Sequence, residues 1–308
     1  MTLVVLAAGM GSRYGGLKQM DPMNAEGDFI IDYSVYDAIQ AGFDEVIFII
    51  KRSMEQDFCE TIGARISGKI KMTLVFQDMD DLPEGYTLPE GRVKPWGTTH
   101  ALRAARDAIK GPYGVINADD FYGRDTFMKL AAHLRKMESG ELGSDKEHAC
   151  AIGFKVKNTL TDKGTASRGV CEVGEDGMLT SIVERLKIRK CGGDAEYEDE
   201  AGNWVFLPGE TVVSMNCWGL PASSISYFKD EFVEFMQKLP EAPNPLKAEI
   251  LLPNSVEKMM EAGLLDVRVY PTESEWFGVT YTEDKPWVQD SIRALTEAGV
   301  YPEHLWAN

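Results

Sequence analysis

The first part of the chain holds four short apolar runs, separated by segments with helical periodicity. Each run has the length of a strand and is rich in β-branched residues; the runs are residues 2–8, 45–51, 71–77 and 113–117. Helical periodicity is found between them, in residues 29–42, 54–66 and 99–109. In the first of these segments, Ile31, Val35 and Ile39 fall on one helical face. Nearly continuous apolar strands that alternate with helices predict a doubly wound, mainly parallel α/β sheet.

The pattern changes after about residue 145. Segments that are typical of β-hairpins cover residues 149–156, 168–185 and 210–220, and helical segments follow at residues 222–238, 253–262 and 284–298. We find no internal repeat and no low-complexity linker. We therefore expect one domain over residues 1–308, whose second half is a β-rich lobe with C-terminal helices. The acidic stretch 194–200 is typical of a solvated loop rather than a metal cluster.

Charge argues against two classes of partner. The chain has 308 residues, of which 44% are hydrophobic, and its 32 Lys and Arg against 49 Asp and Glu give a formal net charge of −17. This charge repels nucleic acid and anionic membrane surfaces. We therefore expect a globular protein whose partners are neither nucleic acids nor membranes.

The N-terminal apolar run, residues 3–8, is too short for a signal sequence or a membrane span and has no basic flank. We therefore expect a cytoplasmic protein. The cysteines are odd in number, scattered and without C-x-x-C spacing, which predicts idle thiols rather than disulfides or a zinc site. They are Cys59, Cys150, Cys171, Cys191 and Cys217.

A glycine-rich turn follows the first strand directly. Gly9 and Gly11 permit positive φ and let backbone N–H groups approach a phosphate, while Arg13 and Lys18 add positive charge beside them. In an open α/β sheet, ligands bind at the carboxyl ends of the strands. The turn therefore favours phosphate binding, although a purely structural turn explains the glycines equally well at this point.

Two familiar phosphate-binding motifs do not fit this turn. The dinucleotide fingerprint needs a third glycine where this chain has Tyr14, and an acid after the second strand where it has Lys51. The P-loop needs a lysine directly after its last glycine. The turn is thus a glycine loop with its own arginine and lysine.

The stretch LAAGMGSRYGGLKQ resembles the first motif of the sugar-1-phosphate nucleotidylyltransferases, the NTP-transferase family of NDP-sugar pyrophosphorylases, in which L-A-x-G-x-G-x-R precedes a lysine. The resemblance implies an enzyme with the Rossmann-like nucleotidyltransferase fold, in which Arg13 and Lys18 act in catalysis. It also implies a set of nucleotide contacts at Leu6, Ala7, Ala8, Gly9, Gly11, Ser12 and Arg13. The spacing of five from Arg13 to Lys18 is closer to that of the cytidylyl branch than to that of the thymidylyl members.

KPWGTTHAL, residues 94–102, is similar to the G-T-x-H-A segment of the family. The resemblance implies that Gly97, Thr98 and the strand-end Gln77 contact a pyrimidine base. A close contact made by small residues suits a base, since it leaves no room for a purine. For His100 we favour a structural or capping role over that of a general base.

YGVINADDFYG, residues 113–123, ends a strand with two carboxylates. The resemblance assigns Asp119 as a Mg²⁺ ligand and Asp120 as its support, and hard oxygen ligands suit that ion. Alternatively, both acids terminate the strand and cap a helix that begins near Asp125.

GVCEVGEDGMLTSIVER resembles the sugar-site hairpin of the family, with Gly169 and Glu184 as sugar contacts and Arg185 where lysine is usual. VSMNCWGL resembles the sugar-site strand that follows. It makes Asn216 a candidate for a sugar hydroxyl and Trp218 a candidate wall of the site. For Trp218, inward packing in a strand is the competing interpretation.

The second metal ligand departs from the family pattern. Many members have an aspartate two residues after a tryptophan, but EWFGVTYTEDKPW has Gly278 there. Downstream, Asp284 is the candidate ligand, together with the neighbouring Glu283. Asp284 also suits the N-cap of the helix that follows, where Pro286 fits the first turn.

Taken together, the resemblance implies that the protein joins a nucleoside triphosphate to a sugar 1-phosphate with Mg²⁺ and releases pyrophosphate, UTP or dTTP being favoured. About residues 1–145 would bind the nucleotide, and about 146–308 the sugar. Two alternatives are a cytidylyltransferase that acts on an alcohol phosphate or other polar head group, and a regulator that binds nucleotide sugar without turnover.

Overall fold

The computed structural model describes residues 1–9, 22–143, 145–160, 164–278 and 284–307. A large sheet runs through it in the order β10-β9-β8-β7-β11-β4-β1-β2-β3, and β6 pairs with β11 and β12 beside this path. Its strands are β1 (Thr2–Leu6), β2 (Glu45–Ile50), β3 (Lys71–Phe76), β4 (Tyr113–Asn117), β6 (Glu147–Lys155), β7 (Ala166–Val173), β8 (Leu179–Cys191), β9 (Asp194–Glu198), β10 (Trp204–Leu207), β11 (Val212–Leu220) and β12 (Leu265–Pro271). A separate small pair joins β5 (Asp120–Phe121) to β13 (Phe277–Gly278).

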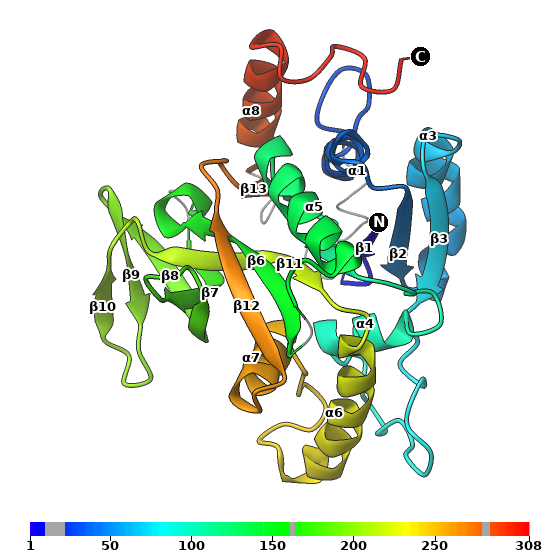
Figure 1. Ribbon diagram of the computed structural model, residues 1–308, viewed down its shortest axis with the longest axis vertical. Helices are drawn as coiled ribbons and strands as arrows, with labels where there is room; N and C mark the ends of the chain where they lie inside the picture. The colour runs from blue at the N-terminus through cyan, green and yellow to red at the C-terminus, as the bar shows by residue number, and fades with distance from the viewer. Residues whose placement is uncertain (10–21, 144, 161–163, 279–283, 308) are drawn as a thin grey trace.

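Helices cover both faces of the sheet (Figure 1). They are α1 (Ile30–Ala41), α2 (Glu55–Phe58), α3 (Ala64–Ile66), α4 (Thr98–Ala104), α5 (Arg124–Ser139), α6 (Ser224–Lys238), α7 (Leu252–Glu261) and α8 (Lys285–Glu297). Side chains of β1 alternate between two cores: Leu3 and Val5 pack with α1, α3 and α5, and Val4 packs with α4, α6 and α7. Because both faces are buried, each strand can be apolar throughout.

The parallel part of the sheet is the one predicted from the apolar runs. Strands β4, β1, β2 and β3 are parallel neighbours, and Leu6 at the end of β1 lies opposite Asn117 of β4 and Ile49 of β2. Their carboxyl ends therefore meet at one edge. This confirms the doubly wound α/β fold.

The second half is β-rich, as predicted, but its pairing is mostly antiparallel and contains a branch. Along one edge of β11, Val213 and Ser214 pair with β7, whereas Trp218, Gly219 and Leu220 pair with β4. A register shift between Ser214 and Trp218 separates the two partners. The branch joins the parallel half of the sheet to the β-rich lobe.

Three strands, β9, β10 and β12, lie where sequence analysis did not place them, and β10 pairs antiparallel with β9. The prediction of a loop over residues 194–200 is wrong, because residues 194–198 form strand β9, in which Ala195 is fully buried. Two acids of β9 form ion pairs with cations of the neighbouring β8, Glu196 with Arg189 and Glu198 with Lys187. Strand β12 runs parallel to β6 and was missed.

Two helices differ from their expected form. The helical segment 54–66 contains a π-helical stretch, η3 (Cys59–Gly63). The helix expected over residues 99–109 ends at Ala104. Strand β13, Phe277–Gly278, lies within the stretch EWFGVTY.

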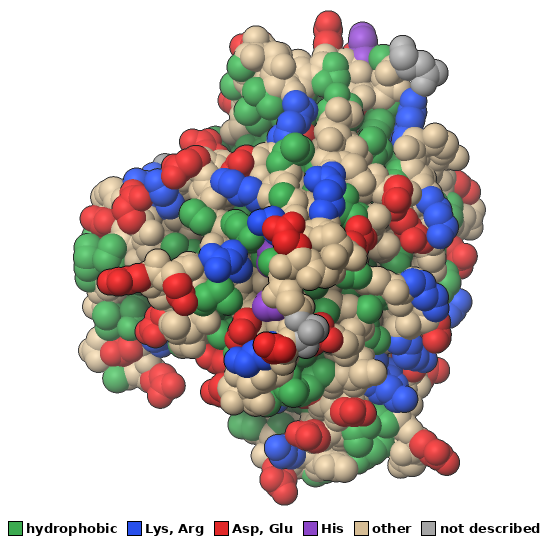
Figure 2. Space-filling view, viewed as in Figure 1, with side chains coloured by type: hydrophobic (Ala, Val, Ile, Leu, Met, Phe, Trp, Pro, Cys, Tyr) green, Lys and Arg blue, Asp and Glu red, His purple; other side chains and the backbone are tan. Residues whose placement is uncertain are grey.

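The five cysteines are free thiols, with Cys150, Cys171 and Cys217 buried and Cys59 and Cys191 exposed. None of the helices in the described part of the chain combines the length and apolar character needed to cross a bilayer. Figure 2 shows Lys and Arg interspersed with Asp and Glu over one face of the molecule.

Buried carboxylates of α1 hold the C-terminal segment in place. Asp37 accepts hydrogen bonds from the hydroxyl of Tyr301, at 2.5 Å, and from Nε of Arg124, at 2.9 Å. One turn earlier, Asp32 accepts one from the indole of Trp306 at 2.9 Å. Burial raises the pKa of both carboxyls above its usual value, although the surrounding hydrogen-bond donors oppose this shift. The residues after α8 are thus anchored to helix α1.

We expect Tyr301→Phe to lower the free energy of unfolding by about 1 to 3 kcal/mol, because it leaves a buried carboxylate short of a donor. Urea denaturation measures this loss. Tyr36→Phe is the matched control, because Tyr36 lies next to Asp37 on α1 and packs its ring against Tyr301 and Trp306. Its effect on the free energy of unfolding should stay within about 0.5 kcal/mol. Equal losses in the two variants would contradict the anchoring role of the Tyr301 hydroxyl.

Candidate functional site

The first motif leaves the sheet at its carboxyl edge. The backbone N–H of Ala7 donates to the carbonyl of Ile49 at 2.8 Å, and that of Ala118 donates to the carbonyl of Leu6 at 3.1 Å. Ala7 and Ala8 are buried, and the following Gly9 is exposed. The start of the glycine loop and the end of β4 are therefore adjacent. Gly11, Ser12, Arg13 and Lys18 lie outside the described residues.

Two carboxylates follow β4 and differ in their surroundings. Asp119 is half-buried. Asp120 is buried, and its Oδ2 accepts hydrogen bonds from Nδ2 of Asn117 at 2.9 Å and from the hydroxyl of Tyr122 at 3.3 Å. The alternative that these acids cap the following helix is wrong, because the N-cap of α5 is Gly123. The arrangement leaves Asp119 as the more accessible carboxylate of the pair.

Gly278 lies directly beside this pair. It faces Asp120 across the β5–β13 ladder, and a Cβ at this position would lie 2.9 Å from the Asp119 carbonyl oxygen and 3.1 Å from Oδ1 of Asp120. Since real Cβ atoms essentially never show contacts under 3.0 Å, the position has no room for an aspartate. The departure from the family motif is thus built into the packing.

Asp284 is buried and occupies the N-cap position of α8, as its capping interpretation predicts, with Pro286 in the first turn. Its side chain makes no capping hydrogen bond to the helix. Within the described ranges, no group of three or more His, Cys, Asp or Glu side chains is placed to hold a metal ion. Glu283 lies outside those ranges.

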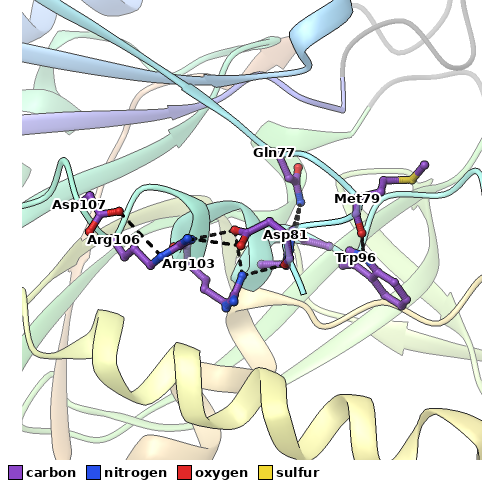
Figure 3. A network of polar contacts seen from close by, with 9 residues as sticks. Gln77, Met79, Asp81, Trp96, Arg103, Arg106 and Asp107 are labelled. Atoms are coloured by element: carbon purple, nitrogen blue, oxygen red, sulfur yellow. Dashed lines mark hydrogen bonds and ion pairs between the residues drawn. The ribbon is translucent and has the colours of Figure 1, made fainter. Parts of the chain in front are cut away.

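The candidate base-binding residues form one connected group (Figure 3). Nε2 of Gln77 donates to the carbonyl of Gly97 at 2.9 Å and lies 3.2 Å from Nδ1 of His100. Gly97 is the N-cap of α4 with φ +104°, and any Cβ there would collide with the backbone of Ile250. The hydroxyl of Thr98 accepts from the backbone N–H of Leu252 at 2.8 Å. Gln77, Gly97 and Thr98 therefore lie together, as the motif predicts for a binding segment.

His100 is fully buried within α4. Its Nε2 lies 3.1 Å from the carbonyl oxygen of Asp81, and burial lowers its pKa to about 4. A histidine that is neutral and bonded at both ring nitrogens suits the structural role expected for it, and it is not the helix cap.

The candidate sugar-binding residues lie on both sides of the branch in the sheet. Gly169 of β7 faces Glu184 of β8 as a cross-strand pair. Asn216 lies in β11 between the β7-paired and β4-paired parts, with φ +57°, and its Oδ1 is buried without a hydrogen-bond partner. A strained residue with an unsatisfied acceptor is typical of a ligand site. Trp218, by contrast, is fully buried between Val115 and Ala151, which supports inward packing over a wall of the site.

Tyr122 was missed by sequence analysis, and it connects the two halves of the site. Its fully buried hydroxyl accepts from the backbone N–H of Asn117 at 3.0 Å and lies 2.9 Å from the Met215 carbonyl and 3.3 Å from Asp120 Oδ2. The acid pair and the bulge at Asn216 are therefore held together by one side chain. A tyrosine that directly follows the two-residue strand β5 carries no sequence signal for such a role.

Arg168 was also missed. It is buried, donates from Nε to the hydroxyl of Thr159 at 3.1 Å, and stacks 4.5 Å from the centre of the Trp276 ring. Burial lowers its pKa to about 10, against the opposing charges of Asp120 and Glu184. Burial likewise raises the pKa of Glu184, and Arg168 lowers it. Arg168 thus supplies positive charge between the acid pair and the sugar-side carboxylate.

Comparison with known proteins agrees with this arrangement. Residues 2–209, more than half of the chain, match the family described as nucleotidyl transferase. A curated relative, the bifunctional protein GlmU of Hyphomonas neptunium (strain ATCC 15444), is 29% identical over 198 residues, which are 61% of this chain. The match covers 36% of GlmU, so the chain spans about a third of the length of this relative.

Two solved structures share the fold. The inositol-1-phosphate CTP transferase from T. maritima is 11% identical with a TM-score of 0.61, and the match covers 96% of each chain. A UDP-glucose pyrophosphorylase complexed with UDP-glucose is 17% identical with a TM-score of 0.58, and 95% of this chain and 98% of that chain are covered. The family match over residues 2–209, with the start of the first motif and the strand-end acids at one edge of a doubly wound sheet, shows that the chain belongs to the nucleotidyl transferase family of enzymes.

Proposed function

We propose that the protein transfers a nucleotidyl group from UTP or dTTP to a sugar 1-phosphate. A phosphate oxygen of the sugar phosphate attacks the α-phosphorus, the bond to the bridging oxygen breaks, and pyrophosphate leaves as the nucleotide sugar forms. A phosphate monoester is largely ionised near neutrality, so no general base is needed. The names of two structural neighbours of this chain, a CTP transferase and a UDP-glucose pyrophosphorylase, support nucleotide transfer to a phosphorylated polyol or sugar.

The observation that carries the proposal is the position of the Tyr122 hydroxyl. It lies within hydrogen-bond distance of Oδ2 of Asp120, at the edge of the sheet where we place the phosphates. It also lies within hydrogen-bond distance of the carbonyl of Met215, next to Asn216, whose Oδ1 has no hydrogen-bond partner. A phosphate-handling edge and a polar site for hydroxyl groups are therefore adjacent. This neighbourhood fits a substrate that carries both a phosphate and hydroxyls, and it lies at a switch point of the sheet, where α/β proteins bind ligands.

Mg²⁺ fits the donor set at this edge. Asp119 offers a half-buried carboxylate at the end of β4, and Asp284 is the second candidate ligand. Magnesium ions in nucleotide sites are commonly held by one or two carboxylates and by substrate phosphates. When bound, the ion would neutralise charge on the triphosphate.

The remaining roles belong to residues of the chain. A triphosphate and a sugar phosphate together carry about six negative charges, and like charges 4 Å apart repel by about 4 kcal/mol at an effective dielectric constant of 20. We assign Arg13 and Lys18 to counter this charge as it develops on the pyrophosphate. We assign Glu184 and Asn216 Oδ1 as acceptors for sugar hydroxyls, and Gly169 as a further sugar contact.

One observation favours a second candidate. The spacing of five between Arg13 and Lys18 is closer to that of the cytidylyl branch, which would make the protein a cytidylyltransferase for an alcohol phosphate or other polar head group. Pyrophosphate release with each nucleotide separates the two candidates. The third alternative, a regulator without turnover, would release none.

The proposal is tested by measuring pyrophosphate release with Mg²⁺, crossing UTP, dTTP, CTP and ATP with a panel of sugar 1-phosphates and inositol 1-phosphate. We expect turnover with UTP or dTTP and a sugar 1-phosphate, and a loss of about a hundredfold in kcat for Arg13→Ala and for Lys18→Ala. Unchanged melting temperatures would show that both variants are folded. Near wild-type kcat in either one would contradict its catalytic role.

Asn216→Gly separates binding from stability. Glycine adopts positive φ without strain, so we expect an unchanged or higher melting temperature. The variant lacks the buried acceptor, so the KM for the sugar phosphate should rise about tenfold while the KM for the nucleotide stays within about twofold. A parallel rise in both KM values would remove Asn216 from the sugar site.

A further inference from the structure

The amide of Gln77 is held in one orientation by two acceptors. Its Nε2 donates one proton to the carbonyl of Gly97, at 2.9 Å, and faces Nδ1 of His100 at 3.2 Å. An amide nitrogen only donates, so Nδ1 of His100 accepts and the proton of the imidazole is on Nε2. Nε2 in turn donates to the carbonyl of Asp81 at 3.1 Å. The backbone carbonyl of Asp81 thus fixes the His100 tautomer that carries its proton on Nε2.

The Asp81 carbonyl is itself held firmly. It also accepts from Arg103 at 2.9 Å, and the Asp81 carboxylate pairs with Arg103 at 2.9 Å and with Arg106 at 2.7 Å. Burial opposes the charge of Asp81, but Arg106 and Arg103 hold the pKa of this carboxyl below its usual value. The ring of His100 packs 4.7 Å from that of Phe232. The imidazole therefore cannot turn to offer its other nitrogen without breaking these contacts.

This network leaves Gln77 with one free function. Both Nε2 protons are used inside the protein, and Figure 3 shows the carbonyl oxygen of Gln77 turned away from the network. No residue in the described ranges donates a hydrogen bond to this oxygen. A rotation of the amide by 180° would place the oxygen against two acceptors. Gln77 therefore presents an acceptor and cannot exchange it for a donor.

We propose that His100 is a positioning residue that makes Gln77 an obligate acceptor toward the nucleobase, and that it thereby selects bases with an N–H at the facing position. This inference rests on the proposed function and on the contact between Gln77 and the base that the family motif implies. Uracil and thymine carry a donor at N3, whereas N3 of cytosine is an acceptor. A freely turning glutamine would pair with either base. The fixed amide accounts for a preference for UTP or dTTP over CTP.

The test is equilibrium binding of UTP and of CTP, measured by calorimetry in the presence of Mg²⁺, for the wild-type protein and its variants. We expect the wild type to bind UTP at least tenfold more tightly than CTP. In His100→Phe, which keeps the ring but loses both nitrogens, this ratio should fall at least fivefold, the equivalent of one hydrogen bond of about 1 kcal/mol. His133→Phe is the matched control, because His133 is a second buried histidine, on α5 and bonded to Tyr270, and it should leave the ratio unchanged.

A double-mutant cycle shows whether His100 acts through Gln77. Gln77→Leu should lower the UTP to CTP ratio by itself, and adding His100→Phe should change it no further, because the partner is already absent. Additive losses would overturn the proposal, as would equal weakening of both nucleotides in His100→Phe. A wild type that binds neither nucleotide would instead overturn the proposed function, and one that binds both equally would overturn this inference alone.

A measurement on the wild type keeps the proposal testable if His100→Phe does not fold. Nitrogen-15 NMR distinguishes the two tautomers of a neutral imidazole by the shifts of its ring nitrogens. We expect the proton of His100 on Nε2, with a coupling between Nδ1 and Nε2 of Gln77 across their hydrogen bond. A proton on Nδ1 would reverse the orientation of the Gln77 amide and overturn the proposal.

Discussion

Strand β11 changes partner along one edge, and the geometry of the candidate site depends on this change. Up to Ser214 it pairs with β7 of the β-rich lobe, and from Trp218 it pairs with β4 of the parallel sheet. Between them the pairing register of β11 with β6 shifts, and Asn216 has φ +57°. A residue other than glycine adopts this conformation only when its surroundings require it. Here the branch of the sheet imposes the strain.

The Tyr122 hydroxyl connects the two parts of the candidate site that meet at this branch. It connects the backbone of Asn117 at the end of β4 with the Met215 carbonyl in the bulge. Because the hydroxyl is fully buried, leaving any of these polar groups unpaired would be costly. The acid pair after β4 and the residues around Asn216 of β11 therefore form one unit. Fully satisfied buried networks of this kind favour a single arrangement.

A second network of polar contacts orders the segment that leads to Gly97 and His100. The long loop between β3 and α4 lacks strands and helices, and arginines hold it in place: Arg92 donates to the carbonyls of Pro245, at 2.7 Å, Pro95, at 3.1 Å, and Ala248, at 2.7 Å. Its guanidinium also stacks 3.5 Å from the Trp96 ring. Ordering this loop places Gly97 and His100 against Gln77. In this chain of net charge −17, Arg92 thus orders a loop.

The sequence by itself determined the α/β class, the four parallel strands and the start of the first motif at the end of β1, because apolar periodicity and backbone freedom are local properties. It also pointed to the residues around Asp119, Gln77 and Asn216, since their motifs are contiguous in the chain. It did not show β9, whose acidic side chains are compensated only by cations on a neighbouring strand.

Only the tertiary structure decided which of these side chains meet, and in which state. Trp218 proved to be core because both neighbours of its strand bury it. Tyr122 and Arg168 gained their roles from partners far away in the chain, at Met215 and at Trp276. The orientation of the Gln77 amide depends on a histidine tautomer set by a carbonyl in a loop. Such contacts arise between distant segments, so no local pattern of residues encodes them.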